Sequence, residues 1–254
     1  MKAKFYVLPL LAAAFLASCG PNSTGLSSNA SQPSTSSEAT SVAPTFESFT
    51  LERLHEARVN KTLPSLNGKL VTVKGKVTFA KYGGADNEDG ALTIQSGKYA
   101  VEVTYPSAYS VNVGDAVEVK GAFTQVPSGD VDTIWISTFK STNPAFDIKV
   151  IDETISVETV TITKEADLIE YDSSKSSMAF TVTGNRTNAA FVGKLSEGDT
   201  EFIVANKLFV ADKFPEAPYE VGDNVKYDGV FSFSGDSSAK VIRYFDKAGF
   251  SKAN

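Results

Sequence analysis

The sequences VGDAVEVKGAF (Val113–Phe123) and VGDNVKYDGVF (Val221–Phe231) decide the fold, because one pattern, V-G-D-x-V-x-x-x-G-x-F, occurs twice in the chain. In each copy Gly and Asp favour a turn, since Gly permits positive φ and Asp can accept hydrogen bonds from nearby backbone. The residues after the turn alternate between apolar and polar, which predicts a strand. A glycine in the middle of that strand indicates a bend or bulge, as a small closed barrel requires.

A second feature recurs at almost the same spacing. LVTVKGKVTF (Leu70–Phe79) and MAFTVTG (Met178–Gly184) are alternating strands that each contain a glycine. Alternation places on one face of the first strand Val71, Val73, Gly75, Val77 and Phe79, and on one face of the second Met178, Phe180, Val182 and Gly184. The shared spacing predicts an internal duplication, with one domain in residues 46–146 and another in residues 147–254.

The fold class predicted from these patterns is all-β, with about five strands in each half. Those of the first half are expected at 69–79, 91–96, 99–105, 115–124 and 131–139. Those of the second half are expected at 177–186, 200–205, 207–211, 224–232 and 239–245. A short helix is predicted ahead of each set, at 51–59 and 163–171.

The order G-x-x-V-x-V-x-G-x-V, hairpin, V-G-D-x-V-x-V-x-G resembles the OB-fold modules of secreted bacterial lipoproteins and extracellular nucleases. Residues 68–139 match this order well and residues 177–245 match it loosely. The resemblance implies two tandem five-stranded Greek-key barrels. OB-folds bind oligonucleotides and oligosaccharides, mainly through the face of strands 2 and 3 and two flanking loops. Since fold does not fix function, the ligand has to be argued from side chains.

The N-terminal residues predict an address outside the cytoplasm. Lys2 and Lys4 precede an apolar run of 13 residues, which is shorter than the roughly 20 needed to span a bilayer and is typical of a signal peptide. The sequence LASCG resembles the lipobox of bacterial lipoproteins, which implies removal of residues 1–18 and acylation of Cys19, for example with palmitate. Cys19 is the only cysteine in the chain, so no intrachain disulfide can form.

A tether is predicted between this anchor and the first barrel. Residues 20–45 hold eight Ser, four Thr and three Pro, and such a segment buries too little apolar surface to fold. With the lipidated cysteine, residues 19–45 are therefore expected to be a disordered leash. The mature protein is expected to be anchored to the cell membrane by lipid, on its extracytoplasmic side, without spanning it.

Nucleic acid is the first ligand to consider, and it requires positive charge together with stacking aromatic rings. Residues 46–146 contain ten Lys and Arg against eleven Asp and Glu, and residues 147–254 contain twelve against eighteen. The first half is therefore the better candidate. Its predicted ligand-binding residues are Lys74 and Lys76 on the outer face of the first strand, Tyr82 in the loop that follows, and Trp135 on the last strand.

Two other functions use the same framework. The aromatic residues could stack on the sugar rings of an oligosaccharide or cell-wall polymer, and the barrels could instead bind other surface proteins as a structural subunit. No enzyme activity, cofactor or metal is expected. The one histidine, His55, lies outside the predicted barrels, and the acidic loop Gly83–Gly90 lacks the spacing of a calcium-binding EF-hand.

Overall fold

The computed structural model describes residues 43–81, 90–105, 111–126, 133–187, 190–206, 219–235 and 240–253. They belong to the compact unit Ala43–Asn254. The elements of its first half are β1 (Glu47–Ser48), α1 (Leu51–Val59), η1 (Leu63–Leu66), β2 (Leu70–Lys81), β3 (Gly90–Ser96), β4 (Tyr99–Tyr105), β5 (Ala116–Val126), β6 (Thr133–Ser137) and β7 (Asp147–Val150). Those of its second half are β8 (Val160–Ile162), α2 (Glu165–Glu170), β9 (Lys175–Thr187), β10 (Ala190–Leu195), β11 (Glu201–Asn206), β12 (Asn224–Gly235), β13 (Lys240–Tyr244), η2 (Lys247–Gly249) and β14 (Phe250–Lys252).

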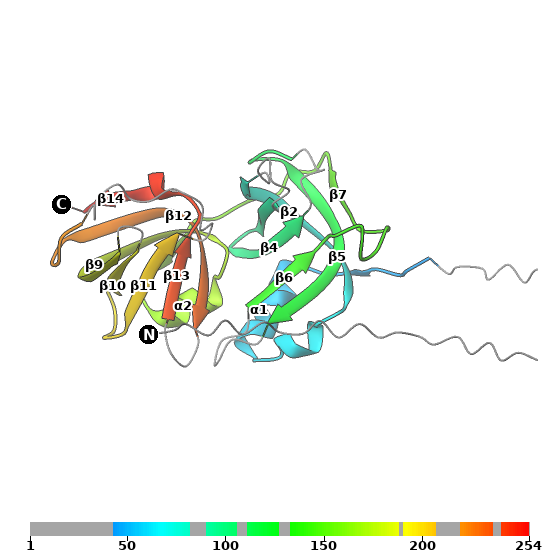
Figure 1. Ribbon diagram of the computed structural model, residues 1–254. Helices are drawn as coiled ribbons and strands as arrows, with labels where there is room; N and C mark the ends of the chain where they lie inside the picture. The colour runs from blue at the N-terminus through cyan, green and yellow to red at the C-terminus, as the bar shows by residue number, and fades with distance from the viewer. Residues whose placement is uncertain are drawn as a thin grey trace, which may run out of the picture. The chain divides into compact units, whose positions relative to one another are not determined.

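The described strands form two closed barrels of the same topology (Figure 1). In barrel 1 the strand order is β2-β3-β4-β6-β5, and pairing of β2 with β5 closes the ring. In barrel 2 the order is β9-β10-β11-β13-β12, and β12 pairs with β9. The third and fifth strands of each barrel, β4 with β6 and β11 with β13, run parallel. The predicted all-β class with two tandem five-stranded barrels is confirmed, and each sheet gains two further short strands.

The repeated V-G-D sequence forms the turn that leads into the fourth strand of each barrel. In the first copy the Asp115 N–H donates to the Asn112 carbonyl at 3.1 Å, and Gly114 has φ of +104°. This matches a type II turn, which requires positive φ at its third residue and therefore favours glycine there. Val77 of β2 fixes the turn to the barrel, because its carbonyl accepts from Gly114 and its N–H donates to Asp115.

The second copy reproduces this arrangement bond for bond. The Asp223 N–H donates to the Glu220 carbonyl, Gly222 has φ of +97°, and both residues exchange backbone hydrogen bonds with Val182 of β9. The Asp223 carboxylate also accepts from the ammonium of Lys252 and from the Glu220 N–H, each at 2.8 Å. These two donors hold the pKa of Asp223 below its ordinary value. The duplicated sequence therefore serves one structural purpose in both barrels.

The glycine in the middle of each fourth strand marks the point where that strand changes partner. Gly121 follows the four residues of β5 that pair with β7 and precedes the five that pair with β6. Gly229 likewise lies between the residues of β12 that pair with β14 and those that pair with β13. A strand that serves two partners along one edge must curl, and glycine removes the side chain that would resist the curl.

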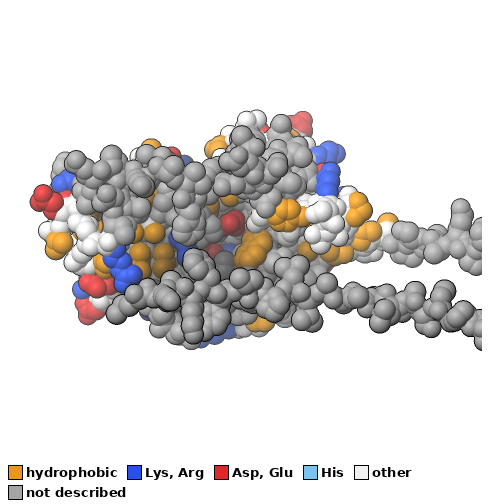
Figure 2. Space-filling model, in the orientation of Figure 1, with side chains coloured by type: hydrophobic (Ala, Val, Ile, Leu, Met, Phe, Trp, Pro, Cys, Tyr) orange, Lys and Arg blue, Asp and Glu red, His pale blue; other side chains and the backbone are white. Residues whose placement is uncertain are grey.

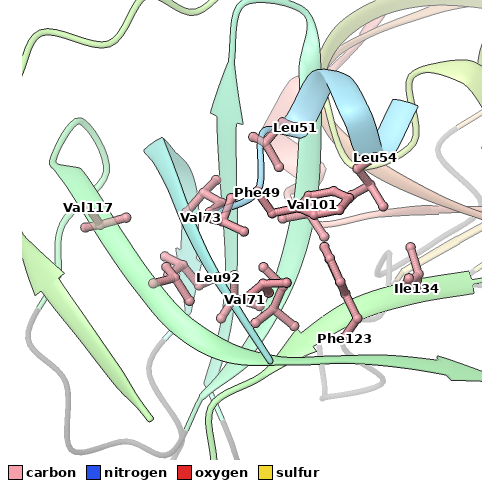
Figure 3. Close-up of a cluster of buried hydrophobic side chains, with 14 of the residues drawn as sticks. Phe49, Leu51, Leu54, Val71, Val73, Leu92, Val101, Val117, Phe123 and Ile134 are labelled. Carbon is pink, nitrogen blue, oxygen red and sulfur yellow. The ribbon is translucent and has the colours of Figure 1, made fainter. Parts of the chain in front are cut away.

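Helix α1 closes one end of barrel 1 and has the bounds predicted for it. Its N-terminus is capped by Thr50, whose hydroxyl accepts from the Arg53 N–H. Leu51 and Leu54 are buried together with Phe49 from the preceding segment. Figure 3 shows these three side chains packed with the buried residues of the barrel. The cap therefore adds apolar burial to a barrel too small to rely on its strands alone.

Alternation misplaces one residue of the first barrel strand. Phe79 was expected to share the inner face with Val77, but a register irregularity between these two residues shifts the pairing, so that Phe79 lies opposite Thr93 of β3. A bulge of one residue moves the next side chain to the other face of the sheet. Phe79 is consequently only partly buried, and its ring contacts Phe245, with 4.5 Å between ring centroids.

The second barrel differs from its prediction in one strand. The hairpin partner of β11 is β10, which was not predicted. The strand expected at 207–211 lies outside the described residues. Strand β10 was not predicted because its sequence, AFVGKL, is short and lacks a turn residue directly before it.

The first sheet runs on through β7 to Val150, past the predicted boundary at 146.

Candidate ligand-binding faces

When the five barrel strands are numbered in chain order, hydrogen-bonded neighbours follow the order 1-2-3-5-4 in both halves. Strand 4 then pairs with strand 1 and closes the barrel. A five-stranded Greek-key barrel of this connectivity is the OB-fold. The described part of the chain is thus a tandem pair of OB-type barrels. The outer face of strands 2 and 3 is the expected ligand face of such barrels, and here it belongs to β3 and β4 in barrel 1 and to β10 and β11 in barrel 2.

No protein-family model and no curated protein sequence matches the chain. Several solved structures resemble it. A murine DNA-binding protein bound to double-stranded DNA has a TM-score of 0.40 and 11% identity, with 72% of this chain and 96% of that chain covered. The Ifi202 HINa domain in complex with 20-bp double-stranded DNA gives 0.37 and 10%, covering 74% and 96%. A replication protein A heterotrimer bound to single-stranded DNA gives 0.30 and 10%, covering 83% and 70%. Likenesses this weak assign no ligand to this chain.

The two predicted lysines stand on β2 with different surroundings. Lys74 is exposed and forms an ion pair and hydrogen bond with Glu153. That hydrogen bond raises the pKa of Lys74. Lys76, two residues further on, is partly buried between Gln95 of β3 and Ala116 of β5. An ion pair must be broken before Lys74 can bind a phosphate, whereas Lys76 is less exposed and lies opposite the buried Gln95.

The structure does not gather the predicted aromatic residues around these lysines. Trp135 lies on the outer face of β6, because its neighbours Ile134 and Ile136 point into the core. Its side chain is partly buried. It is opposite Thr124 of β5, whereas Lys74 is opposite Glu118 of the same strand. Six residues of strand separate those two positions, which is about 20 Å. Tyr82, the fourth predicted ligand residue, lies outside the described residues.

Half of the lysines whose side chains the structure describes are paired with carboxylates. The pairs are Lys74–Glu153, Lys120–Glu118, Lys140–Asp147, Lys194–Asp199, Lys226–Asp228, Lys240–Glu165 and Lys252–Asp223. The hydrogen bond from Lys194 lowers the pKa of Asp199, and the one from Lys226 lowers that of Asp228. Exposed pairs of this kind add little stability, but they reduce the positive charge that a polyanion would meet.

Barrel 2 presents an aliphatic stripe on the outer face of its sheet. Val192 of β10 lies opposite Ile203 of β11, which in turn lies opposite Val241 of β13. All three side chains are partly exposed. Arg243, one outward position along β13, extends the same face. In Figure 2 hydrophobic side chains with Lys or Arg beside them show on the surface over β10 and β11.

Part of the corresponding face of barrel 1 is buried, whereas Glu102 and Thr104 of β4 on the same face are partly exposed. Thr93 and Gln95 of β3 alternate with core residues and so point outward, as does Ala100 of β4, yet all three are fully buried. The Gln95 amide donates to the Glu158 carbonyl at 2.7 Å, and its oxygen accepts from the Lys175 N–H at 2.7 Å. Both partners belong to the second half of the chain.

Further contacts from α1 and β4 reach the same segment of the second half. The buried Arg58 guanidinium donates to the Ala100 carbonyl at 3.2 Å and lies 3.7 Å from the Asp172 carboxylate. The ring of His55 stacks on Tyr99 and also lies near Tyr171, with centroid distances of 4.3 and 6.1 Å, and the two tyrosine rings lie 6.4 Å from each other. A hydrogen bond with Glu170 raises the pKa of Tyr171 to about 12. His55 carries no recognisable sequence motif, because it is the single histidine of the chain.

No cluster of three or more His, Cys, Asp or Glu side chains suited to a metal occurs among the described residues. Within the same residues, no helix has the length and apolar character to cross a membrane.

Proposed function

We propose that this chain is a lipid-anchored extracytoplasmic protein whose tandem OB-type barrels bind a nucleic-acid strand. The observation that carries the binding part is the outer face of β10, β11 and β13, which is partly exposed and holds Arg243 beside an aliphatic stripe. OB-type barrels bind oligomers through this face. The signal peptide, the lipobox-like LASCG and the tether support display of this face outside the cytoplasm.

Binding is tested with fluorescence anisotropy of labelled, mixed-sequence single-stranded DNA against residues 43–254. We expect micromolar affinity at about 50 mM salt and a steep loss at about 200 mM, because phosphate contacts release counterions. Substituting Arg243→Gln should weaken binding and reduce the slope of log K against log salt by about 0.7, the value for one phosphate contact on a single strand.

Lys252→Gln is the matched control, since Lys252 on β14 is also cationic but is paired with Asp223. It should leave affinity and slope unchanged. Lys76→Gln and Trp135→Ala test the predicted site on barrel 1. A loss of DNA affinity confined to these two variants would show that the strand binds to barrel 1 instead. Absence of binding at the lower salt would refute the nucleic-acid proposal.

An oligosaccharide is the second candidate, and the ion-paired lysines together with the acidic second half favour it. A neutral glycan needs partly exposed apolar surface and hydrogen-bonding groups but no net positive charge. Cosedimentation of residues 43–254 with purified cell-wall polymer, at both salt concentrations, would separate the two candidates, because only the glycan complex should persist at the higher salt.

Membrane anchoring rests on one residue, Cys19. We expect the full chain, produced in a bacterial host, to enter the membrane fraction and to incorporate a palmitate analogue. Cys19→Ser should abolish the labelling and release the protein from the membrane, because two or more acyl chains are needed for stable anchoring. Ser28→Ala in the tether is the control and should behave as the native chain. Equal membrane recovery for Cys19→Ser would refute the anchor.

A further inference from the structure

We propose that the second half of the chain permanently covers Thr93, Gln95 and Ala100 on the ligand face of barrel 1, so that barrel 2 offers a ligand the more open OB face. The duplicated sequence suggests two equivalent binding modules. The described contacts give the two barrels different roles. Calling the occupied surface a ligand face rests on the proposed function, whereas its occupation by barrel 2 does not.

The first line of evidence is the burial of two polar side chains that point away from the apolar core of barrel 1. Thr93 and Gln95 alternate with the core residues Leu92 and Ile94, and their side chains point away from the barrel interior. An outward-facing polar side chain on an isolated barrel would be solvated. Both are fully buried here, and the groups that cover Gln95 come from outside barrel 1.

The second line is the identity of the covering groups around Gln95. Its amide nitrogen donates to the carbonyls of Gly97 and Glu158, and its amide oxygen accepts from the Lys175 N–H. The turn between β3 and β4 extends this pairing, because Gly97 exchanges backbone hydrogen bonds with Ser156 and Glu158. A buried amide that is satisfied in this way fixes one arrangement of the two halves, since any displacement leaves buried polar groups unpaired.

The third line comes from the flanks of the same face. On one side the Ser174 hydroxyl donates to the Lys98 carbonyl at 2.6 Å. On the other side the ring of Phe245, which follows β13, contacts Phe79 on β2. Thr93 lies opposite Phe79 and two residues from Gln95. Barrel 2 and the segment that leads into it therefore bracket Thr93.

The test uses the reactivity of an introduced thiol and needs no ligand. Residues 43–254 contain no cysteine, so Thr93→Cys creates a unique reporter. The Thr93 hydroxyl makes no hydrogen bond among the described residues, and the substitution removes none from its side chain. We expect this thiol to react with the disulfide reagent DTNB at least about 100-fold more slowly than the thiol of Lys74→Cys, because reaction requires a local opening. The two should react alike in denaturant.

Gln95→Ala identifies what covers the site. Added to Thr93→Cys, it should raise the rate about tenfold, since it removes two hydrogen bonds to the second half of the chain. Ala100→Cys is the second reporter if Thr93→Cys does not fold, because Ala100 is equally buried on the same outer face. A native reporter thiol as reactive as that of Lys74→Cys would overturn the proposal, and so would a slow rate that Gln95→Ala leaves unchanged. Either result is independent of DNA binding, so it is distinguishable from failure of the proposed function.

Discussion

Replacing Arg58 with methionine is expected to lower the free energy of unfolding of residues 43–254 by about 3 to 5 kcal/mol, the usual cost of leaving a buried charge without its partner. Arg58 is buried, and its guanidinium lies 3.7 Å from the Asp172 carboxylate while donating to the backbone of barrel 1. Burial lowers the pKa of Arg58, and Asp172 opposes that change. Methionine keeps much of the volume but provides neither charge nor donor.

A double-mutant cycle separates the ion pair from the packing of the arginine stem. Asp172→Asn keeps an oxygen that can accept from the Phe233 N–H, as the carboxylate does at 2.9 Å, and so should cost less than Arg58→Met. Arg58→Met combined with Asp172→Asn should recover part of the loss, because no buried charge then remains unpaired. Urea unfolding, followed by tryptophan fluorescence and circular dichroism, measures all three variants. Strictly additive effects would contradict a coupled pair.

Gly121→Ala is expected to destabilise the same unit by roughly 1–3 kcal/mol, the range for overpacking a well-packed core. A Cβ at this position would lie 2.5 Å from the Ile136 Cγ2 methyl and 2.5 Å from the Ser137 carbonyl oxygen. The carbonyl belongs to the backbone of β6, so it cannot rotate away as the end of a side chain could. The loss should therefore lie toward the upper end of that range, measured as a fall in the urea midpoint.

Gly184→Ala is the matched control, because Gly184 also lies within a barrel strand. A Cβ there would approach Val192 only to 3.7 Å, an ordinary van der Waals contact. The free energy of unfolding of Gly184→Ala should be unchanged or higher by up to about 1 kcal/mol, since alanine restricts the unfolded chain more than glycine does. Equal losses for Gly121→Ala and Gly184→Ala would show that strand curvature, and not the close approach of β6, explains the cost.

The two glycines of the repeated sequence show how far a shared pattern predicts structure. The pattern predicted a bent strand at both, and both mark a change of strand partner. The reasons for glycine differ, however. At Gly121 the neighbouring strand fills the space, whereas at Gly229 the ring of Tyr227 does, with its hydroxyl donating to the Val230 carbonyl. Nothing in V-G-D-x-V-x-x-x-G-x-F distinguishes these two environments.

Among the predicted ligand residues, the sequence correctly placed Lys74 on an outer strand face, and it left open the direction of Trp135, which proves to be outward. It could not show that Glu153, 79 residues away, pairs with Lys74, because ion pairing between distant segments leaves no local pattern. The aliphatic stripe of barrel 2 was not predicted either, since one of its strands, β10, was not expected.

Local pattern determined the turns, most barrel strands and helix α1, because hydrogen bonding within a turn, alternation along a strand and capping of a helix each depend on residues close in sequence. Tertiary structure alone decided which faces are open. The bulge that turns Phe79 outward depends on pairing with Thr93, 14 positions away, and the burial of Gln95 under Glu158 and Lys175 depends on contacts 63 and 80 positions away. A glutamine alternating with leucine and isoleucine predicts a solvated outer face, and only the packing of a second barrel against that face makes it an interior.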